Sequence, residues 1–348
     1  MKRLATLAVL IGLTLVACGS DDDAAQDTNP ADAPESIAPA TDELRSPEPA
    51  GSESSVTSSA TDLTGPVTIE HVYGETVIDG LPERIVSLDP QWTDVLTALG
   101  HAPIAAATDP IAGGWFPWQQ ADGIEPIEIA SDYSIPFETI AALQPDLIVG
   151  SWGISDEVAY DTLSAMAPTI PLLGDRDVDP WEDMAAAAGE IFADPDAADA
   201  LVADADQTAA DLLAELPGLE GKTYTLVNYV PGDQIYVVAD PDDGASQLFA
   251  KLGMQIDPDL LALDDGGFGR VELSFEEIGL LDADVLLILA NGADTADIIG
   301  FDTLPAVQSG AYSVLEYAPV VGLNTPSPLS IPYSLDFIRP ALAAAAAT

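Results

Sequence analysis

Two stretches of the chain share one pattern. Residues 137–149 read FETIAALQPDLIV, and residues 275–287 read FEEIGLLDADVLL. Both follow Phe-Glu-x-Ile-x-x-Leu-x-x-Asp with three aliphatic residues after it, and they are 138 residues apart. The first apolar residues recur at helical spacing, and the aliphatic run has the length of a buried strand. Each stretch therefore predicts a helix, a short break and an interior strand.

Weaker matches extend this repeat in both directions. Leu99-Gly100 and Leu252-Gly253 each close an apolar helical pattern, and Asp161-Thr162-Leu163 resembles Asp302-Thr303-Leu304. Three matches in one order predict two related lobes. Aliphatic runs also alternate with helical patterns, which predicts open, mostly parallel α/β sheets. The runs lie at residues 84–88, 147–150, 224–229, 234–239 and 285–290.

A long helical pattern links the two halves. Asp179 and Pro180 suit its start, because Asp caps helices and Pro is favoured at the first helical position. Asp194-Pro195-Asp196 predicts one break within it. The folded body is then predicted to consist of an N-terminal lobe, a linking helix and a C-terminal lobe, at residues 65–179, 180–217 and 218–348.

The first 64 residues have the pattern of an exported, tethered protein. After Lys2 and Arg3, residues 4–17 form an apolar run that has the length of a signal-peptide core and is too short to span a bilayer. The run ends in Leu-Val-Ala-Cys18, which resembles the bacterial lipobox, so Cys18 is the predicted lipidation site. An ordinary cleaved signal is the alternative. Residues 1–17 are predicted to be the signal peptide, and residues 18–64, without aromatic residues, a disordered acidic tether.

The composition excludes several classes of partner and site. The chain has 9 Lys and Arg against 59 Asp and Glu, a net charge of −50, so nucleic acid is not an expected partner. A saline habitat would fit this charge without being established by it. Cys18 is the only cysteine, which excludes disulfides and thiolate metal clusters in the body. His71 and His101 are expected to be structural, and no metal site or cofactor is predicted.

Residues 74–88, GETVIDGLPERIVSL, add a family resemblance. Together with the Leu-Gly and Phe-Glu-x-Ile motifs and with LPAVQSGAYSV at residues 304–314, they resemble the iron-siderophore substrate-binding proteins of bacterial ABC importers. The likeness covers about residues 67–343. It implies two Rossmann-like α/β lobes joined by a single long interdomain helix, with the ligand in the cleft between the lobes.

The resemblance also implies a function. The protein is expected to be an extracytoplasmic lipoprotein, anchored to the cell membrane through Cys18, that is not an enzyme. It is expected to capture a ferric siderophore as a monomer and to deliver it to an ABC permease and its ATPase. Cobalamin or haem is the alternative ligand within the same importer class.

A bulky chelate requires aromatic walls and a few polar groups. Aromatic residues in or near the loops after predicted strands are the candidates, although each could instead pack in the core. Arg270 or Arg176 would suit an anionic chelate, whereas Arg84 is expected to anchor its strand. The predicted ligand contacts are Trp92, Trp115, Tyr133, Trp152, Tyr229, Arg270 and Tyr333.

The resemblance implies that one exposed carboxylate on each lobe docks on basic residues of the permease. Glu157 and Glu276 match these sites by position. Glu138 is the repeat partner of Glu276 and the rival candidate for the first lobe. A merely solvated acidic surface is the alternative interpretation.

Two other function classes are the alternatives to a solute-binding protein. A hydrolase is disfavoured because the chain lacks a G-x-S-x-G nucleophile motif and neither histidine has a triad context, so no catalytic residue is predicted. A surface lipoprotein that binds another protein would instead carry polar or clashing residues where the aromatic loops face each other.

Overall fold

A computed structural model describes residues 65–154, 156–264 and 269–348. The predicted signal peptide, the tether and Cys18 lie outside the described residues. Within the described part, every helix is too short or too polar to cross a membrane.

The N-terminal lobe is built on a fully parallel sheet of five strands in the order β5-β4-β3-β6-β7. An antiparallel hairpin, β1 (Val67–His71) and β2 (Gly74–Ile78), precedes it. The neighbours β3 and β6 carry connections that leave in opposite directions, so their carboxyl ends form a topological switch point, where α/β proteins bind ligands. The remaining bounds are β3 Ile85–Ser87, α1 Pro90–Ala98, β4 Ala105–Thr108, β5 Glu125–Glu128, α2 Phe137–Ala142, β6 Leu147–Val149, α3 Glu157–Ser164 and β7 Thr169–Ile170.

The C-terminal lobe has a mixed sheet in the order β11-β9-β8-β12-β13, with β10 also paired to β8. The strands β8, β10, β12 and β13 are parallel, but β9 is antiparallel to β8 and to β11. The predicted strands are therefore present, and the parallel pattern is broken by one hairpin. The strand bounds are β8 Thr223–Tyr229, β9 Ile235–Val238, β10 Gln255–Ile256, β11 Arg270–Leu273, β12 Val285–Leu289 and β13 Tyr312–Leu315.

Short helices join these strands, and a long one ends the chain. The predicted helix of the second repeat is a 3-10 helix, η2 (Phe275–Leu280). The others are α6 Gly244–Lys251, α7 Pro258–Leu261, η3 Thr295–Asp297, η4 Phe301–Thr303, α8 Pro305–Ser309, α9 Tyr317–Asn324 and α10 Ser330–Ala346.

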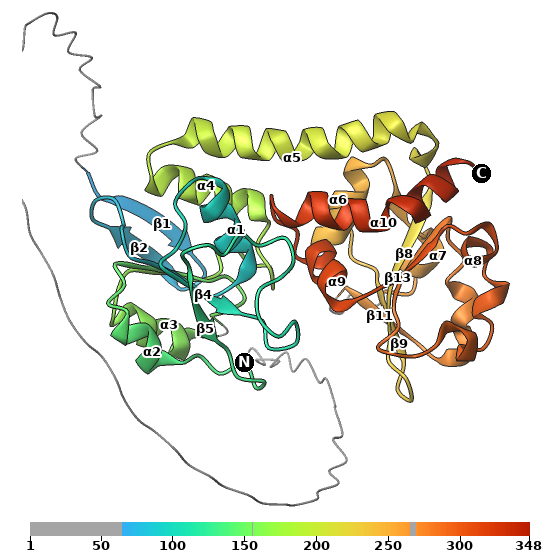
Figure 1. Cartoon of the computed structure of the whole chain (residues 1–348), viewed down its shortest axis with the longest axis horizontal. Helices are drawn as coiled ribbons and strands as arrows, with labels where there is room; N and C mark the ends of the chain where they lie inside the picture. The colour runs from blue at the N-terminus through green and yellow to red at the C-terminus, as the bar shows by residue number, and fades with distance from the viewer. Residues whose placement is uncertain (1–64, 155, 265–268) are drawn as a thin grey trace, which may run out of the picture. The chain divides into compact units, whose positions relative to one another are not determined.

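The linking segment consists of two helices, α4 (Trp181–Ile191) and α5 (Pro195–Glu215), followed by the 3-10 turn η1 (Pro217–Leu219). The predicted break is confirmed, because Asp194 caps α5 by accepting a hydrogen bond from the Ala197 N–H. The α5 helix contacts α4 at one end and α6 and α10 at the other, so it connects the lobes (Figure 1). The lobe boundaries themselves stay predictions.

Asp179 does not cap the linking helices as expected. Pro180 occupies the cap position of α4, and the Asp179 carboxylate accepts hydrogen bonds from the N–H groups of Leu173 and Gly174. The buried Asp179 side chain therefore holds the loop after β7 and does not cap α4.

The repeat is visible in the way each sheet is anchored. Asp146, just before β6, accepts a hydrogen bond from the Arg84 N–H at 2.8 Å. Asp284, just before β12, accepts one from the Thr223 N–H at 2.8 Å. Arg84 and Lys222 stand at the same place in the two copies, and both side chains bond to the neighbouring segment, as expected for Arg84. The match of Asp161–Leu163 with residues 302–304 is not structural, since the first lies in α3 and the second spans η4.

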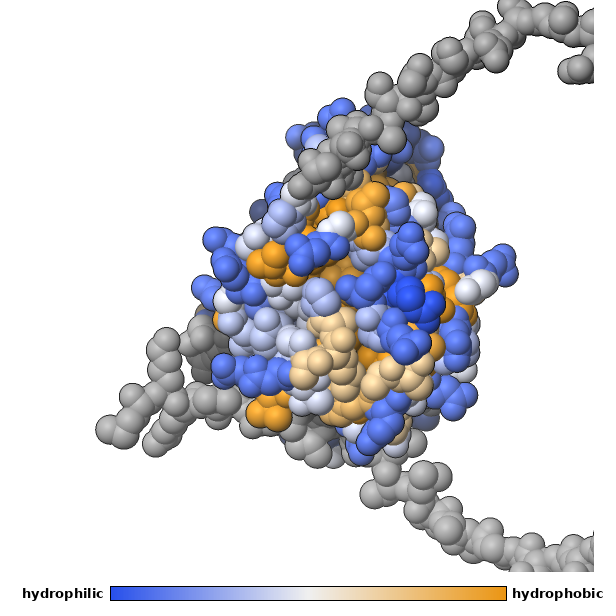
Figure 2. Space-filling view, turned by 90° about the vertical axis from the view of Figure 1, so that its left-hand side faces the viewer, coloured by the Kyte–Doolittle hydropathy of each residue, from blue (hydrophilic) through white to orange (hydrophobic). Residues whose placement is uncertain are grey.

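Three hydrophobic clusters stabilise the body. One cluster packs against a face of the N-terminal sheet and a second against a face of the C-terminal sheet. The largest lies among α1, α4, α5, α6 and α10 and includes residues of both lobes. Each lobe therefore has a core of its own, and the helical side joins the two. On the face shown in Figure 2, apolar surface is broken into patches by hydrophilic residues.

Candidate functional site

A buried polar network lies at the switch point of the N-terminal sheet. Asp89 caps α1, and its carboxylate accepts hydrogen bonds from the N–H groups of Trp92 and Ser151, which ties the loops after β3 and β6 together. The Ser151 hydroxyl donates to Asp179 at 2.9 Å. Burial raises the pKa of Asp89 to about 6 and also raises the pKa of Asp179. No cation pairs with either carboxylate among the described residues, so this network is held by neutral donors.

A second buried carboxylate contacts the other lobe. Asp94, on α1, accepts hydrogen bonds from the Trp118 indole N–H at 2.8 Å and from the Ser327 hydroxyl at 2.5 Å. The Gln91 side-chain amide donates to the carbonyl of Pro326 at 2.9 Å. Pro326 and Ser327 lie between α9 and α10, so α1 is bonded directly to the C-terminal lobe. Burial raises the pKa of Asp94 to about 7.

Aromatic rings from both lobes meet beside this contact. Phe116 and Trp118, in the loop after β4, are stacked with ring centroids 4.7 Å apart. Trp118 lies 5.3 Å from Tyr333 of α10, and Phe116 lies 6.2 Å from Tyr317 of α9. The Tyr317 hydroxyl donates to Asp109 at 3.1 Å. We call Phe116, Trp118, Tyr317 and Tyr333 the aromatic cluster.

Four of the predicted contacts lie near these groups. Tyr333 belongs to the aromatic cluster, and Trp115 is half-buried in the same loop as Phe116. Tyr133 is 43% exposed, and its hydroxyl interacts with that of Tyr317. Trp152 is half-buried in the loop after β6, and its indole N–H is buried with no acceptor among the described residues.

Trp92, a predicted ligand contact, does not lie in a loop as expected. Its side chain is fully buried in the core cluster that includes residues of both lobes. The α1 helix begins at Pro90, which places Trp92 on the inner face of a helix instead of in a loop. We therefore leave Trp92 out of the candidate site.

The structure separates Tyr229 from Arg270. Tyr229 pairs with Ile235, which is level with Leu273, whereas Arg270 pairs with Val238. The two residues thus lie three strand positions apart, or about 10 Å along the sheet. Tyr229 packs on Phe275 at 5.2 Å. They do not share one edge of the sheet, contrary to the expectation of similar loop positions.

Arg270 lies beside a contact between the lobes. Its guanidinium bonds to the Asp243 carboxylate at 2.8 Å. The neighbouring Asp242 faces Arg176 of the N-terminal lobe, with a nitrogen–oxygen distance of 3.9 Å. Arg176 also donates to the carbonyl oxygen of Asp242 at 3.3 Å. Both arginines therefore meet acidic side chains of one C-terminal loop, residues 240–243.

The candidate docking carboxylates are all on the surface. Glu157 is the first residue of α3, and Glu276 lies in η2; both are exposed. Glu138 in α2 is exposed as well. Exposure is what docking requires, but it does not choose between Glu157 and Glu138.

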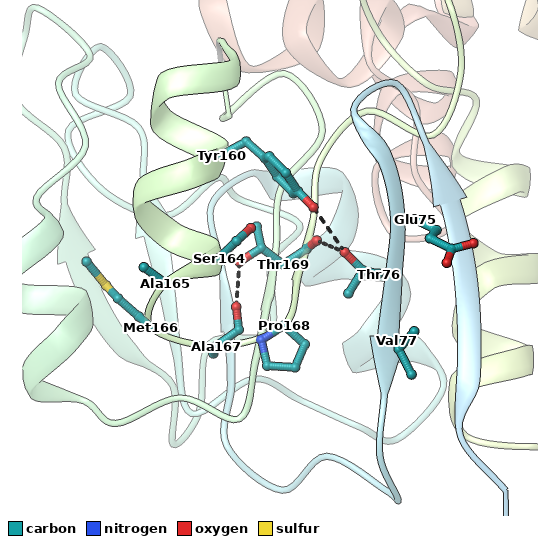
Figure 3. Close-up of a pocket in the computed structure, with 10 residues that line it drawn as sticks. All are labelled: Glu75, Thr76, Val77, Tyr160, Ser164, Ala165, Met166, Ala167, Pro168 and Thr169. Carbon is teal, nitrogen blue, oxygen red and sulfur yellow. Dashed lines mark hydrogen bonds between the residues drawn. The ribbon is translucent and has the colours of Figure 1, made fainter.

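A depression between β2 and α3, with a volume of about 430 Å³, is a second place to consider (Figure 3). Its central polar groups are already bonded within the protein. The Thr76 hydroxyl donates to the Thr169 carbonyl at 2.7 Å and lies 3.0 Å from Nε2 of His71. Nδ1 of His71 accepts the Tyr73 N–H, and burial lowers the pKa of the ring. This network holds the hairpin in place, so His71 is structural and the depression is the weaker candidate.

Other histidine and carboxylate groups are not arranged as a metal centre in the described ranges, where no group of three or more such residues could hold an ion. His101 stacks on Phe192 with centroids 3.6 Å apart.

Sequence reasoning missed Asp109, Phe116 and Tyr317. Asp109 directly follows β4, and Tyr317 comes two residues after β13. Neither strand is among the predicted aliphatic runs, so the rule that selected Trp152, a residue just after a predicted strand, does not reach them. No sequence signal points to Ser327, whose partner Asp94 is 233 residues away.

Known proteins resemble this chain over most of its described length. A "Probable siderophore-binding lipoprotein YfiY" of Bacillus subtilis is 29% identical over 238 residues, which is 66% of this chain and 70% of that protein. A "Fe(3+)-citrate-binding protein YfmC" of the same organism is 28% identical over 236 residues, 64% of this chain and 68% of that protein.

A solved structure, a periplasmic solute binding protein from Mycobacterium smegmatis, superposes with a TM-score of 0.67 at 27% identity, covering 81% of this chain and 99% of that one. The family described as "Periplasmic binding protein" matches residues 85–311, a span that runs from β3 to the residue before β13. The two-lobed α/β fold is that of solute-binding proteins. The chain therefore belongs to the periplasmic binding protein family.

Proposed function

We propose that this protein captures a ferric siderophore between its lobes, as a monomer, and delivers it to an ABC permease and its ATPase without catalysing a reaction. The family and the names of the relatives support a solute-binding role in iron uptake. The aromatic cluster is the main evidence for the position of the site. It brings together rings from the loop between β4 and β5 and rings from α9 and α10.

The residues at this place suit a chelate. The half-buried rings of Trp115, Trp152, Tyr317 and Tyr333 offer an apolar surface to the organic part of the ligand, whereas Phe116 and Trp118 are buried. The buried Trp152 N–H, which has no acceptor among the described residues, offers a donor for an oxygen of the chelator. The iron needs no side chain of the protein when the chelator supplies all its ligands. The residues proposed to contact the ligand are Trp115, Tyr133, Trp152, Tyr317, Tyr333 and Arg270.

Tryptophan fluorescence tests this proposal. Titration with ferric hydroxamates, ferric catecholates, ferric citrate, haem and cobalamin should give saturable quenching by a ferric chelate, and none by the iron-free chelator. Trp115→Ala should weaken binding at least tenfold. Tyr73→Ala, which removes a half-buried ring from the turn between β1 and β2, should leave it unchanged. Tight binding of haem or cobalamin with no binding of any ferric chelate would contradict the proposal.

Docking is proposed to use Glu157 and Glu276. Basic residues of a permease would pair with these exposed carboxylates, one on each lobe. Glu157→Arg combined with Glu276→Arg should abolish uptake of radioactive iron chelate by cells while the purified protein still binds the chelate. Glu138→Arg is the matched control and should leave uptake intact. Loss of uptake in the control alone would move the docking site to Glu138.

Membrane attachment is proposed to be a lipid on Cys18. The chain then lies outside the cytoplasm, held by its N-terminus. Cys18→Ser should release the protein from the membrane pellet into the soluble fraction of fractionated cells. If the variant stays in the pellet, another anchor holds the protein.

A further inference from the structure

The basic side chains of the described residues are all engaged. Of the chain's nine Lys and Arg, three precede residue 65 and six follow it, since 9 − 3 = 6. Arg84 bonds to carbonyl oxygens, and each of the other five meets at least one carboxylate. Lys222 and Arg339 do so at Asp284 and Glu215, and Lys251 is held between Glu182 of α4 and Asp206 of α5. Arg176 and Arg270 remain as the cations that could meet a ligand.

Arg270 is held by an acid that is itself fixed. Asp243 caps α6 by accepting the Ala245 N–H at 2.9 Å, and its side chain is only 11% exposed. The same carboxylate binds the Arg270 guanidinium at 2.8 Å. An anionic ligand that approached Arg270 would also approach this carboxylate, which cannot turn away without uncapping the helix. The net charge that the pair presents is therefore close to zero.

Arg176 presents no free positive charge either. It lies 3.9 Å from the Asp242 carboxylate and donates to the Asp242 carbonyl oxygen. Asp175 and Asp177 flank it in the sequence, and both are exposed. The surroundings of this guanidinium thus carry more negative than positive charge.

The charged groups described beside the aromatic cluster are acidic. Asp109 is half-buried beside it and accepts hydrogen bonds from the Tyr317 hydroxyl and from the N–H groups of Ile111 and Ala112. Glu316 is exposed next to Tyr317. Aromatic faces beside carboxylates are the surroundings that favour an ammonium group over an anion.

We propose, building on the proposed function, that the site selects ferric chelates of zero or positive net charge, the trihydroxamate class, and rejects anionic ones. Three singly charged hydroxamates neutralise Fe³⁺, and a pendant amine brings the complex to +1. Three catecholates leave −3, and citrate complexes are anionic as well. One relative is named for Fe(3+)-citrate, so family membership does not fix the net charge of the chelate. Two features of this chain favour a neutral or positive chelate: Arg176 and Arg270 are paired with acids, and Asp109 lies beside the aromatic cluster.

One scaffold at three charges tests the proposal. Ferrioxamine B carries a free terminal amine and a net charge of +1, its N-acetyl derivative is neutral, and its N-succinyl derivative is −1. Fluorescence titration at low salt should show the +1 complex binding about tenfold tighter than the −1 complex, with the neutral one between them. The ratio should shrink as salt rises to about 0.5 M, because screening removes the difference.

The outcomes separate this inference from the proposed function. Equal or reversed affinities across the series, or preferred binding of a ferric catecholate or ferric citrate, overturn the charge selection and leave siderophore capture standing. A protein that binds none of these ferric complexes overturns the proposed function itself.

Variants locate the source of the selection. Asp109→Asn should reduce the ratio between the +1 and −1 complexes about threefold. Asp199→Asn removes the same charge from an exposed position on α5 and should leave the ratio unchanged. Tyr317→Phe removes the hydrogen bond to Asp109 but keeps the charge, so it should also preserve the ratio. A ratio that responds equally to all three variants contradicts the assignment to Asp109.

Discussion

The two lobes share the groups that hold each sheet together. In both, an Asp just before an inner strand accepts a hydrogen bond from the backbone at the start of the neighbouring strand, with Arg84 or Lys222 beside it. In both, the first α-helix of the lobe, α1 or α6, ends at a glycine with positive φ, Gly100 or Gly253. The copies therefore agree where strands are aligned and helices stop.

They differ at the acid that begins that helix. Asp89 in the N-terminal lobe is fully buried and bonds only to neutral donors, whereas Asp243 in the C-terminal lobe is paired with Arg270. The acid at the start of this helix thus belongs to a buried network in the N-terminal lobe. In the C-terminal lobe it neutralises Arg270, a candidate ligand contact. Shared positions explain the fold, and the differences between the copies locate the function.

The largest expected difference between the lobes is in the free energy of unfolding that each capping residue, Asp89 or Asp243, contributes. Asp89→Ala leaves the N–H groups of Trp92 and Ser151 buried without an acceptor, so the free energy of unfolding should fall by about 3 kcal/mol. Asp243→Ala removes a cap with some solvent access and should cost about 1 kcal/mol. Urea unfolding followed by circular dichroism measures both. Asp89→Asn, which keeps an acceptor, is the control and should recover most of the loss; equal losses for the two alanine variants would contradict the comparison.

The strand anchors should instead behave alike. Asp146→Ala and Asp284→Ala each remove a charged acceptor of backbone N–H groups, at an expected cost of about 2 kcal/mol. The Lys222 pair with Asp284 is partly exposed and adds at most about 0.5 kcal/mol. Calorimetric melting of both variants tests the equivalence. A difference of several kcal/mol between them would mean that only one lobe depends on this anchor.

Much of the fold could be predicted because its signals are local. Helical spacing, aliphatic runs and the Asp-Pro break at residue 194 report on neighbours in the chain, and the helices and strands follow them closely. The antiparallel β9 could not be placed this way, since an isolated strand pattern carries no direction. The 3-10 form of η2 could not be predicted either, because its apolar residues have the same helical spacing as those of α2.

The site was less accessible to sequence reasoning. Trp152 could be found because it follows β6, and strand ends mark the edge of a sheet; Tyr333, expected near such a loop, lies in α10. Trp92 was expected in a loop, but α1 already begins at Pro90 and places it in the core. The bond of Asp94 with Ser327 and the pairing of Arg270 join segments that only the folded chain brings together.

Buried and paired acids should also respond to pH with opposite signs. The pKa of Asp94, raised by burial to about 7, lies above its unfolded value of about 4, so the folded state binds the extra proton between these values. Its contribution to stability therefore falls as pH rises from about 4 to 7, by up to roughly 1 kcal/mol per pH unit. Burial also acts on Asp284, but hydrogen bonds from Thr223 and Lys222 lower its pKa on balance, so its contribution is lost as pH falls below about 4.

Asp94→Asn isolates the first of these effects. The variant keeps an oxygen for Trp118 and Ser327 but cannot take up the proton, so the difference in unfolding free energy from the wild type should change steadily between pH 4 and 7. Urea unfolding at four pH values measures it. Asp284→Asn should give a flat difference over the same range and a change below about pH 4; a flat difference for Asp94→Asn would mean that the carboxylate is ionised throughout.

The smallest expected effect distinguishes the two helix-ending glycines. Gly100 and Gly253 have φ values of +83° and +72°, where an alanine is strained by about 1 kcal/mol. A Cβ on Gly100 would meet open space, but a Cβ on Gly253 would lie 3.3 Å from the Cα of Glu220, and backbone gives way less easily than a side chain. Gly253→Ala should therefore lower the melting temperature by a few degrees, and by somewhat more than Gly100→Ala. Calorimetry resolves such a difference, and a larger loss for Gly100→Ala would show that the strain at φ, and not the contact with Glu220, sets the cost.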